Sequence, residues 1–483
     1  MAGRYLVHTF GCQMNAHDSD RMEEVLRAHG WSLATPTGTE EAAEVDLIVL
    51  NTCSVREKAE QKLRSEVGKL APLKARNPGL VIAVAGCVAQ QEGEKLLARV
   101  PHLDLVIGPD NIPELPALAE EQMAGAPPRA RTVFDVDAPR FLAAAPREGE
   151  APVSAFVTTM KGCDERCSFC IVPYTRGPER YRPSREIVDE IARWVRAGAR
   201  EVTLLGQTVD SFRDPALPPP ESDDPDESQF PALLRAIAAE VPDLLRLRYT
   251  SPHPRHLTET LVRAHAELEV LAEHVHMPVQ SGSDRMLKRM IRRYTRAEYV
   301  ARVKRLQAGR PGLTLSTDII VGFPGETNED FEATLSLVAE VGFVGLFGFK
   351  YSPRPFTPAL KLPDDVPEEE KSSRLARLFE LAETQTRAHL ATLVGTTQAV
   401  LVEGPSKTQG LVEGRSRKNE IVHVEAPPGV TLAQLAGAVL PVEIARANKH
   451  SLFGRPTEAG LAALPPPRAH AAAPRRRALP LVL

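Results

Sequence analysis

The sequence predicts an α/β protein with three folded regions: an N-terminal doubly wound parallel sheet, a central partial (β/α) barrel and a small C-terminal antiparallel β-barrel. Two observations predict the first two regions. Apolar runs of strand length alternate with helical patterns over residues 1–145, and the same alternation resumes at Val153. Strands separated by helices favour parallel sheets. Near residue 395 short β-type runs replace the helices, which predicts the small barrel.

The composition is that of a globular protein with several cores. The chain has 483 residues, of which 43% are hydrophobic and 25% charged, and its formal net charge is −4. This length allows several domains. No apolar run approaches the roughly 18 residues that a membrane-spanning helix needs, and the first residues lack the apolar segment of a signal peptide. We therefore expect a cytoplasmic protein that is neither membrane-bound nor polycationic.

The N-terminal region contains the first group of cysteines. Its predicted strands are residues 5–10, 45–50, 80–85 and 103–107. Cys12, Cys53 and Cys87 each follow one of the first three strands closely. They therefore belong at the carboxyl ends of parallel strands, where open α/β sheets bind ligands.

These three cysteines favour a metal centre. Disulfides are rare in a reducing compartment. A single free cysteine is more often a small buried hydrophobic residue. Three at one level of a sheet instead indicate a shared site with three thiolate ligands.

The central region continues the strand–helix alternation. Its predicted strands are residues 155–160, 201–205, 245–250, 274–278, 314–321 and 344–351. One helix is expected to run from its N-cap Ser184 to Ala197, and another from Asn328 to Val341 after the N-cap Thr327. Such a series suits an open (β/α) barrel, whose working face lies at the carboxyl ends of the strands.

The first central strand leads directly into the second group of cysteines. Cys163, Cys167 and Cys170 have the spacing C-x3-C-x2-C. A structural zinc site wants four protein ligands, and no fourth ligand follows at a suitable distance. Iron–sulfur clusters are also usually held by four cysteines, so three would leave one iron open to a substrate or cofactor.

Several segments lie between or beside these elements. Residues 124–152 are predicted to form a linker, and the acidic, proline-rich residues 214–228 a solvated loop. Between residues 285 and 310 there are ten Lys or Arg residues against one acid. A phosphate-binding face and a solvated arginine-rich helix are both open interpretations of this run.

The C-terminal region begins after a predicted helix at residues 368–394. Its expected strands are residues 398–403, 410–414, 420–424 and 439–445. Near their turns lie basic residues that suit RNA phosphates, although ordinary surface charge is the more common role: Lys407, Arg415, Arg417, Lys418, Arg446 and Lys449. Residues 456–483 are rich in Ala, Pro and Arg and are predicted to form a disordered tail.

With these motifs in place, the chain resembles the radical S-adenosylmethionine methylthiotransferases, and most closely the MiaB subgroup that modifies tRNA. The C-x3-C-x2-C loop with Phe169 carries the superfamily resemblance. The subgroup resemblance rests on residues 11–15 (GCQMN), 51–56 (NTCSVR), 86–92 (GCVAQQE), 170–177 (CIVPYTRG), 277–284 (MPVQSGSD), 293–295 (RYT) and 318–327 (DIIVGFPGET). It spans roughly residues 4–455.

The resemblance implies a division of the chain. Residues 1–145 would form a methylthiotransferase N-terminal domain with an auxiliary cluster, and residues 153–394 the radical S-adenosylmethionine domain. Residues 395–455 would form an RNA-binding TRAM-like domain, before the tail at residues 456–483.

It also implies two [4Fe-4S] clusters and S-adenosylmethionine as cofactors. The metal ligands would be Cys163, Cys167 and Cys170 for one cluster and Cys12, Cys53 and Cys87 for the other. The remaining cofactor residues would be Phe169, Gly206, Gln207, Asp318 and Gly322. Gly206 and Gln207 would lie near the methionine end of the cofactor and Asp318 and Gly322 near its adenine, whereas Phe169 would shape the cluster loop. No residue is assigned a catalytic role of its own. His274 and His276 are expected to be packed or hydrogen-bonded rather than ligands.

The implied enzyme adds a methylthio group to C2 of N6-isopentenyladenosine at position 37 of tRNA. The first cluster would reduce S-adenosylmethionine to give a 5′-deoxyadenosyl radical, and the second would supply or hold the sulfur. A radical route suits this carbon, which is neither acidic nor electrophilic, because the cofactor carries the difficult chemistry. The alternatives are methylthiolation of threonylcarbamoyladenosine in tRNA or of a ribosomal protein aspartate, and a non-catalytic RNA-binding iron–sulfur scaffold.

The implied partners are the anticodon stem-loop of tRNA, an electron donor, and a sulfur or cluster donor. A monomer is expected. Two segments depart from the subgroup pattern: residues 206–210 read GQTVD instead of GQNVN, and Phe356 stands where glycine is usual. Both lie at predicted strand ends on the substrate side, so they bear on substrate detail.

Overall fold

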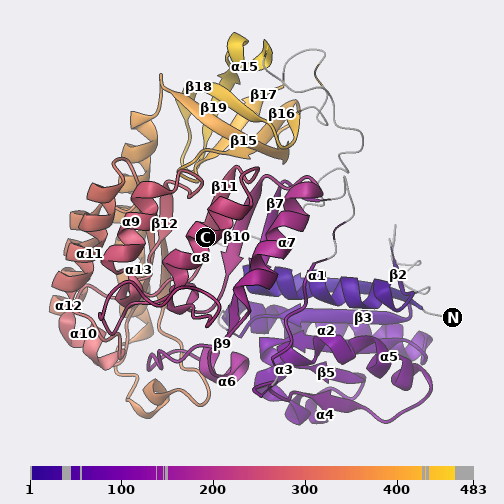
Figure 1. The fold of residues 1–483 in the computed structure, drawn as a ribbon. Coiled ribbons are helices and arrows are strands. Elements are labelled where there is room, and N and C mark those ends of the chain that lie inside the picture. The colour runs from indigo at the N-terminus through magenta and orange to yellow at the C-terminus, as the bar shows by residue number, and fades with distance from the viewer. Residues whose placement is uncertain are drawn as a thin grey trace.

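The computed structural model describes residues 3–34, 45–54, 57–137, 139–144, 146, 151–426, 430 and 435–462. It confirms the predicted fold class. Figure 1 shows the N-terminal sheet and its helices at the lower right, the central strands and helices beside them, and the small barrel at the top.

The N-terminal sheet has six parallel strands in the order β2-β1-β3-β4-β5-β6. Its strands are β1 (Arg4–Phe10), β2 (Ser32–Leu33), β3 (Leu47–Thr52), β4 (Val81–Gly86), β5 (Leu105–Ile107) and β6 (Arg129–Arg131). Its helices are α1 (Gln13–Ala28), α2 (Glu57–Arg76), α3 (Cys87–Glu92), α4 (Glu94–Arg99), η2 (Pro109–Glu114) and α5 (Leu115–Met123). Strand β6 lies inside the stretch expected to be a linker, which is therefore partly ordered.

Alternating side chains of these strands form two cores, one on each face of the sheet. Leu47 and Val49 pack with helices α1 and α5, whereas Ile48 and Leu50 pack with α2, α3 and α4. The period of two follows from the strand geometry. The strand order changes direction between β1 and β3, and open sheets bind ligands at such a switch point.

The central region forms two three-stranded parallel sheets, β11-β10-β7 and β12-β13-β14, joined by a bridge between Leu247 and Leu271. The strands are β7 (Ser154–Thr158), β10 (Glu201–Leu205), β11 (Arg246–Tyr249), β12 (His274–His276), β13 (Thr314–Val321) and β14 (Gly345–Lys350). A short antiparallel pair, β8 (Met160–Lys161) and β9 (Arg180–Tyr181), flanks the cysteine loop. These sheets form the predicted partial barrel.

Helices cover the outer side of these strands (Figure 1). The helical segments of this region are α6 (Val172–Arg176), α7 (Ser184–Arg196), η3 (Val209–Ser211), α8 (Phe230–Glu240), η4 (Pro254–His256), α9 (Glu259–Glu267), α10 (Asp284–Arg289), α11 (Arg296–Gly309), α12 (Asn328–Val341), η5 (Pro358–Lys361) and α13 (Glu368–Thr392). Helix α12 has the expected bounds, and Thr327 caps it in a capping box with Asp330. Ser184 is the first residue of α7 rather than its N-cap.

The acidic insertion at residues 214–228 is only partly the solvated loop that was expected. Asp214 is buried and accepts a hydrogen bond of 2.5 Å from the Ser184 backbone N–H, so it supports the start of α7. Near the other end, the Asp226 carboxylate pairs with Arg255 and Arg302. Both ends of the insertion are thus anchored, while residues 218–225 are exposed.

The C-terminal region is a closed five-stranded barrel in the order β15-β16-β17-β19-β18. Its elements are β15 (Thr397–Pro405), β16 (Leu411–Arg415), β17 (Ile421–Glu425), β18 (Val439–Ala447), β19 (Leu452–Pro456) and the helix α15 (Glu458–Ala462). The sequence did not indicate β19, which pairs antiparallel with β18 but parallel with β17 and so closes the barrel. Helix α15 corrects the predicted tail at residues 458–462, and residues 463–483 lie outside the described residues.

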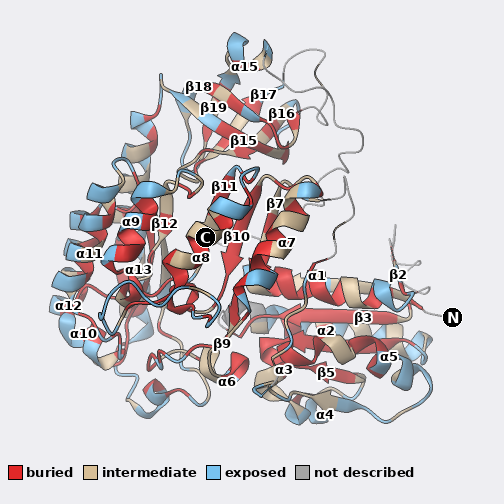
Figure 2. Ribbon diagram, in the orientation of Figure 1, coloured by how far each residue is buried: buried red, intermediate tan, exposed pale blue. Residues whose placement is uncertain are grey.

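Burial follows the layers of the fold. Figure 2 shows the inner strands β3, β4 and β10 as buried, whereas strands of the barrel alternate between buried and more exposed residues and the helices present an exposed outer face. None of the helices described in the structure is long and apolar enough to cross a bilayer.

Candidate functional site

The carboxyl ends of β1, β3 and β4 bring Cys12, Cys53 and Cys87 to one edge of the N-terminal sheet. Cys12 is the N-cap of α1, Cys53 follows β3, and Cys87 begins α3. Cys12 and Cys53 therefore flank the switch point of the sheet. All three are free cysteines. We refer to them as the N-terminal triad.

Small and amide side chains hold this triad together. A Cβ atom on Gly11 would lie 2.4 Å from the Cys53 Cβ, and one on Gly86 would lie 2.3 Å from the Asn51 Oδ1. The Asn51 amide group donates to the Asn15 carbonyl oxygen at 2.8 Å, which ties α1 to the end of β3. The glycines beside the cysteines thus permit a close approach of three strand ends.

The three thiols interact with one another. A hydrogen bond with Cys53 lowers the pKa of the Cys12 thiol to about 6, although burial opposes this shift. Burial raises the pKa of Cys87, while the charge of Arg176 acts in the opposite direction. Clustered thiols next to a cation favour thiolates that can bind metal.

Arg176 reaches the N-terminal triad from the central region. It is the last residue of α6, and its Nε lies 3.3 Å from the Cys87 Sγ. Its Nη2 donates to the Asp18 carboxylate of α1 at 2.6 Å. All three side chains are buried. Burial would raise the pKa of Asp18, but the Arg176 guanidinium lowers it to about 2.

Cys163, Cys167 and Cys170, the central triad, lie in the loop between β8 and α6. Gly162 precedes this loop at φ 80°, and a Cβ there would lie 1.9 Å from the Pro178 carbonyl oxygen. The Gly162 N–H donates to the Gln207 Oε1 at 2.5 Å, which ties the loop to the end of β10. Burial and the neighbouring Cys170 raise the pKa of Cys163, and burial raises that of Cys170 to about 12.

Two polar side chains contact the sulfur atoms of the central triad. The Thr208 hydroxyl lies 2.9 Å from the Cys163 Sγ. The Arg292 guanidinium lies 3.2 Å from the Cys167 Sγ, and it also donates to the Tyr294 hydroxyl and the Pro278 carbonyl. Hydrogen bonds to cysteine sulfur stabilise the thiolate form and tune an iron–sulfur centre.

A buried polar network lies behind the central triad. The Glu165 carboxylate lies 3.2 Å from the His256 Nε2, and the Asp210 Oδ1 accepts from the His253 backbone N–H at 2.8 Å. Burial opposes the shift, but Glu165 and Asp210 raise the pKa of His256 to about 9. Asp210 is one of the departures from the subgroup pattern, and burial raises its pKa to about 7.

Of the other predicted cofactor residues, Gly206 and Gly322 directly follow β10 and β13, whereas Asp318 lies within β13 and Phe169 in the cysteine loop. Gly206 packs against Met160, and Gly322 against the Lys371 side chain. Asp318 lies 3.3 Å from the His276 Nε2. Phe169 packs against an apolar cluster that includes Met290 and Ala359. Most of these residues therefore have structural partners in addition to the role that the resemblance implies.

The basic run between residues 285 and 310 is mostly used inside the protein. Eight of its ten basic side chains have protein partners, as in the ion pairs Arg296–Glu340 and Arg302–Asp226. The two others are Lys288 and Arg293, which are both exposed and form no hydrogen bond or ion pair among the described residues. The run is therefore not a continuous phosphate-binding face.

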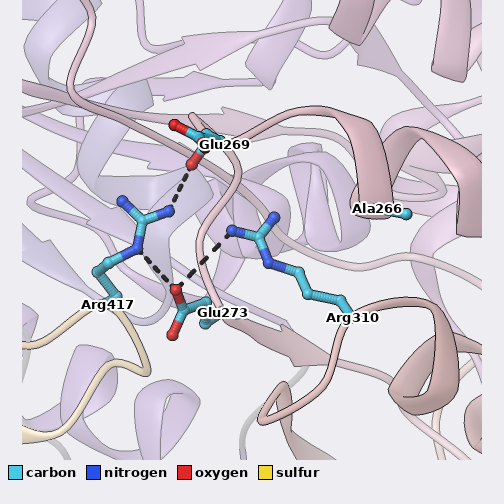
Figure 3. Close-up of a pocket in the computed structure, with 5 residues that line it drawn as sticks. All are labelled: Ala266, Glu269, Glu273, Arg310 and Arg417. Carbon is cyan, nitrogen blue, oxygen red and sulfur yellow. Dashed lines mark hydrogen bonds and ion pairs between the residues drawn. The ribbon is translucent and has the colours of Figure 1, made fainter.

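The basic residues of the barrel also have several structural roles. The Arg417 Nε donates to Glu273 at 2.9 Å, and Arg310 lies 3.9 Å from the same carboxylate. Figure 3 shows these side chains with Glu269 and Ala266, where the barrel meets the central region. Arg417 therefore joins two regions of the chain rather than facing outward from a turn.

Sequence reasoning did not single out Asp18, Arg176, Thr208 or Arg292 for their contacts. In the sequence, Arg176 is part of the motif at residues 170–177 and Thr208 part of the segment at residues 206–210, and neither motif indicates a contact with a cysteine. No local pattern marks Asp18 or Arg292, since each meets its partner across more than a hundred residues of chain.

The donor set of each triad suits the thiolate ligation of an iron–sulfur cluster. Each triad consists of free, largely buried thiols with one guanidinium at a sulfur atom. Across the described ranges, no three His, Cys, Asp or Glu side chains are grouped closely enough to hold a single metal ion. Thiolates spaced around a larger inorganic core are typical of iron–sulfur ligation.

Three family models match consecutive parts of the chain. Residues 4–108 match the Uncharacterized protein family UPF0004, residues 157–338 the Radical SAM superfamily and residues 391–457 the TRAM domain. These matches contain the N-terminal triad, the central triad and the small barrel, respectively.

Full-length relatives carry one common description. The chain is 63% identical to the tRNA-2-methylthio-N(6)-dimethylallyladenosine synthase of Sorangium cellulosum over 99% of both chains. It is 43% identical to the protein of the same description from Neisseria meningitidis serogroup B, over 94% of this chain and 100% of that one.

Among solved structures, the chain is similar in fold to a cobalamin-binding radical S-adenosylmethionine methyltransferase, TsrM, from Kitasatospora setae. The TM-score is 0.52 at 17% identity, covering 74% of this chain and 77% of the other. At this identity the likeness concerns the fold alone.

Proposed function

The chain belongs to the tRNA-2-methylthio-N(6)-dimethylallyladenosine synthase family of radical S-adenosylmethionine enzymes, and we propose that it methylthiolates C2 of N6-isopentenyladenosine in tRNA. The observation that carries the proposal is helix α6, which links the two triads. The helix begins two residues after Cys170, and its last residue, Arg176, contacts Cys87. Two centres so close to one another suit a reaction that joins radical formation to sulfur transfer.

The proposal assigns the cofactors to the two triads. Cys163, Cys167 and Cys170 hold a [4Fe-4S] cluster that binds S-adenosylmethionine, and Cys12, Cys53 and Cys87 hold a second one. When bound, these groups supply reductive cleavage of S-adenosylmethionine and the sulfur that is transferred.

The residues of the chain prepare this site in three ways. Arg292 and Thr208 hold the sulfur atoms of the central triad through hydrogen bonds. Gln207 orients the loop through the Gly162 N–H. Four of the six cysteines, Cys53, Cys87, Cys163 and Cys167, are buried, which limits the access of water to reactive intermediates. Gly206, Asp318, Gly322 and Phe169 complete the cofactor site in this proposal.

The proposal also covers partners and location. The chain acts on the anticodon stem-loop of tRNA as a monomer, with an electron donor and a sulfur or cluster donor. The RNA-binding part is the barrel at residues 395–455, after regions 1–145 and 153–394. A cytoplasmic location accords with a tRNA substrate and with six free cysteines.

Anaerobic turnover with isopentenylated tRNA tests this function, with nucleosides identified by mass spectrometry. A triple Cys→Ala variant of the central triad should lose both 5′-deoxyadenosine and the methylthio nucleoside. The same variant of the N-terminal triad should keep 5′-deoxyadenosine but lose the methylthio nucleoside. Each variant should retain about half of the iron, since each triad holds one cluster.

Two outcomes would contradict the proposal. Formation of the methylthio derivative of threonylcarbamoyladenosine alone would assign a different substrate. Wild-type protein that holds both clusters yet forms no 5′-deoxyadenosine under reducing conditions would indicate a scaffold. The corresponding triple Cys→Ala variants of the relative from Sorangium cellulosum provide a parallel control.

A further inference from the structure

Four exposed residues with an unusual backbone conformation surround the loop of the central triad. Arg166, Ile291, Arg293 and Phe356 have φ angles of 54°, 58°, 55° and 67°. Side chains other than glycine rarely adopt positive φ, and β-branched or bulky ones are real outliers. Such strained residues gather at active sites and ligand clamps. We refer to these four residues as the loop rim.

Ser168 ties the three loops that carry the rim to one another. Its backbone N–H donates to the Met290 carbonyl at 3.0 Å, and its carbonyl accepts from the Ala359 N–H at 2.8 Å. Its hydroxyl donates to the Arg289 carbonyl at 2.8 Å. Rim residues on separate parts of the chain are thus fixed around one serine, two residues before Cys170.

The cations of the rim are not used for internal ion pairs. In the described chain, neither Arg166 nor Arg293 forms a hydrogen bond or ion pair, and both are exposed. The contrast with the eight partnered basic residues of the 285–310 run makes Arg293 distinctive. A fixed backbone with an unpaired guanidinium is suited to bind phosphate.

The apolar part of the rim carries an exposed aromatic pair. Phe356 is 57% exposed, and its ring centroid lies 5.9 Å from that of Tyr174, the third residue of α6. Arg354 anchors the same loop to the N-terminal region through a contact of 3.1 Å with Glu60. An exposed ring held in this way can stack on an unpaired base.

From these observations we infer that the loop rim is a clamp for single-stranded RNA. The Arg166 and Arg293 guanidinium groups bind phosphates of the anticodon loop, and Phe356, backed by Tyr174, stacks on an unpaired base beside the target. Ile291 packs against the sugar or base edge between them. The inference rests on the proposed function and adds the surface that presents the nucleotide. It also explains why Phe356 occupies a position at which glycine would be relaxed.

Glycine substitutions separate RNA binding from folding. Phe356→Gly and Arg293→Gly relieve the strained backbone while they remove the side chain, so the melting temperature should stay equal or rise. The probe is a fluorescein-labelled anticodon stem-loop that carries isopentenyladenosine, with a fully paired two-stranded RNA duplex as comparison. Anisotropy titrations at several salt concentrations give the dissociation constants.

The two variants should differ in their salt dependence. Phe356→Gly should weaken binding of the stem-loop by about tenfold at every salt concentration, the size of one lost base stack. Arg293→Gly should weaken it and reduce the slope of log K against log salt by about 0.7, as expected for one lost phosphate contact to a single strand. Neither should change binding of the fully paired duplex.

A matched control excludes general surface effects. Phe379→Ala removes an exposed ring from α13, outside the barrel and the loop rim, and should bind like the wild type. Phe356→Leu keeps an apolar side chain, and it should weaken binding even if Phe356→Gly folds poorly.

Clamp variants that bind within about twofold of the wild type would overturn the clamp and leave the proposed function intact. Wild-type protein that neither binds nor modifies the stem-loop would instead count against the proposed function.

Discussion

At the scale of single residues, each cysteine triad receives one buried guanidinium group, but the two differ in counter-charge. Arg176, at Cys87, also pairs with the Asp18 carboxylate at 2.6 Å. Arg292, at Cys167, donates to a hydroxyl and a carbonyl oxygen, and it forms no ion pair within the described part of the chain. A reduced cluster carries one more negative charge, so the uncompensated cation should make the central centre easier to reduce.

This asymmetry predicts opposite shifts in two variants. Arg292→Gln should lower the midpoint potential of the central cluster by roughly 60 mV, one tenfold step for a one-electron couple. Asp18→Asn should raise the midpoint potential of the N-terminal cluster by a similar amount, because the positive charge of Arg176 is then no longer balanced by a carboxylate. Redox titrations followed by electron paramagnetic resonance measure both, each in a background that lacks the other triad. Equal potentials in variants and parents would contradict the assigned role.

The sequence indicated the six cysteines but not the residues that touch them. Spacing alone marks Cys163, Cys167 and Cys170, and strand ends mark Cys12, Cys53 and Cys87. The contacts of Asp18 and Arg292 depend on how distant segments pack, which no local pattern encodes. The family resemblance includes the motif at residues 170–177, which contains Arg176, but it does not indicate that Arg176 contacts Asp18 and Cys87.

At the scale of elements, the sequence predicts the ends of a helix or strand correctly where the spacing of its apolar residues is regular and, for a helix, a capping residue precedes it. Helix α12 and strand β13 have the bounds that the sequence predicts. The predicted strand at residues 155–160 is instead divided into β7 and β8, because the chain turns into the cysteine loop. Strand β19 was missed since its segment, Leu452–Pro456, is short and ends in proline.

Helix α9 and strand β11 are joined by a buried histidine whose titration predicts acid sensitivity. The Tyr249 hydroxyl lies 2.7 Å from the His265 Nε2, and burial lowers the pKa of His265 to about 3. The folded protein thus holds a neutral imidazole, while the unfolded chain takes up a proton below its ordinary pKa of about 6.5. This contribution to stability is complete above pH 6.5 and is lost as the pH falls towards 3.

His265→Gln should flatten that part of the stability profile. Urea unfolding between pH 7 and pH 4 should show a slope that is smaller than in the wild type by up to roughly 1.4 kcal/mol per pH unit. A wild-type slope in His265→Gln would show that this histidine does not titrate as proposed.

At the scale of the whole molecule, buried polar contacts join the three regions. Asp110 of the N-terminal region accepts from Lys161 and Arg180 of the central region at 3.0 and 2.5 Å. On the other side, Arg246 donates to the carbonyl oxygens of Arg415 and Ser416 at 3.2 and 3.0 Å. The barrel is thus docked onto β11, which fixes its distance from the cysteine sites.

Arg246→Ala should loosen this docking. Loss of a buried charged donor should lower the unfolding free energy by about 2 kcal/mol. Hydrogen exchange should speed up in the turn at residues 415–420, while amides of the barrel core at Val400 and Val442 remain protected. Arg446→Ala, on the barrel away from β11, is the control. Unchanged exchange in the turn would show that Arg246 does not hold the barrel.

Helix α6 has a consequence for how such proteins are recombined. It spans five residues, about 7.5 Å at the rise of an α-helix. Its first residue follows the central triad closely, and its last residue, Arg176, contacts Cys87 of the N-terminal triad. A chimera with the N-terminal region of one homologue and the central region of another inherits Arg176 from one parent and Asp18 from the other. If the homologue that supplies the N-terminal region has no carboxylate at the position of Asp18, the chimera buries Arg176 without a counter-charge. Asp18 and α6 should therefore come from the same parent in any such chimera.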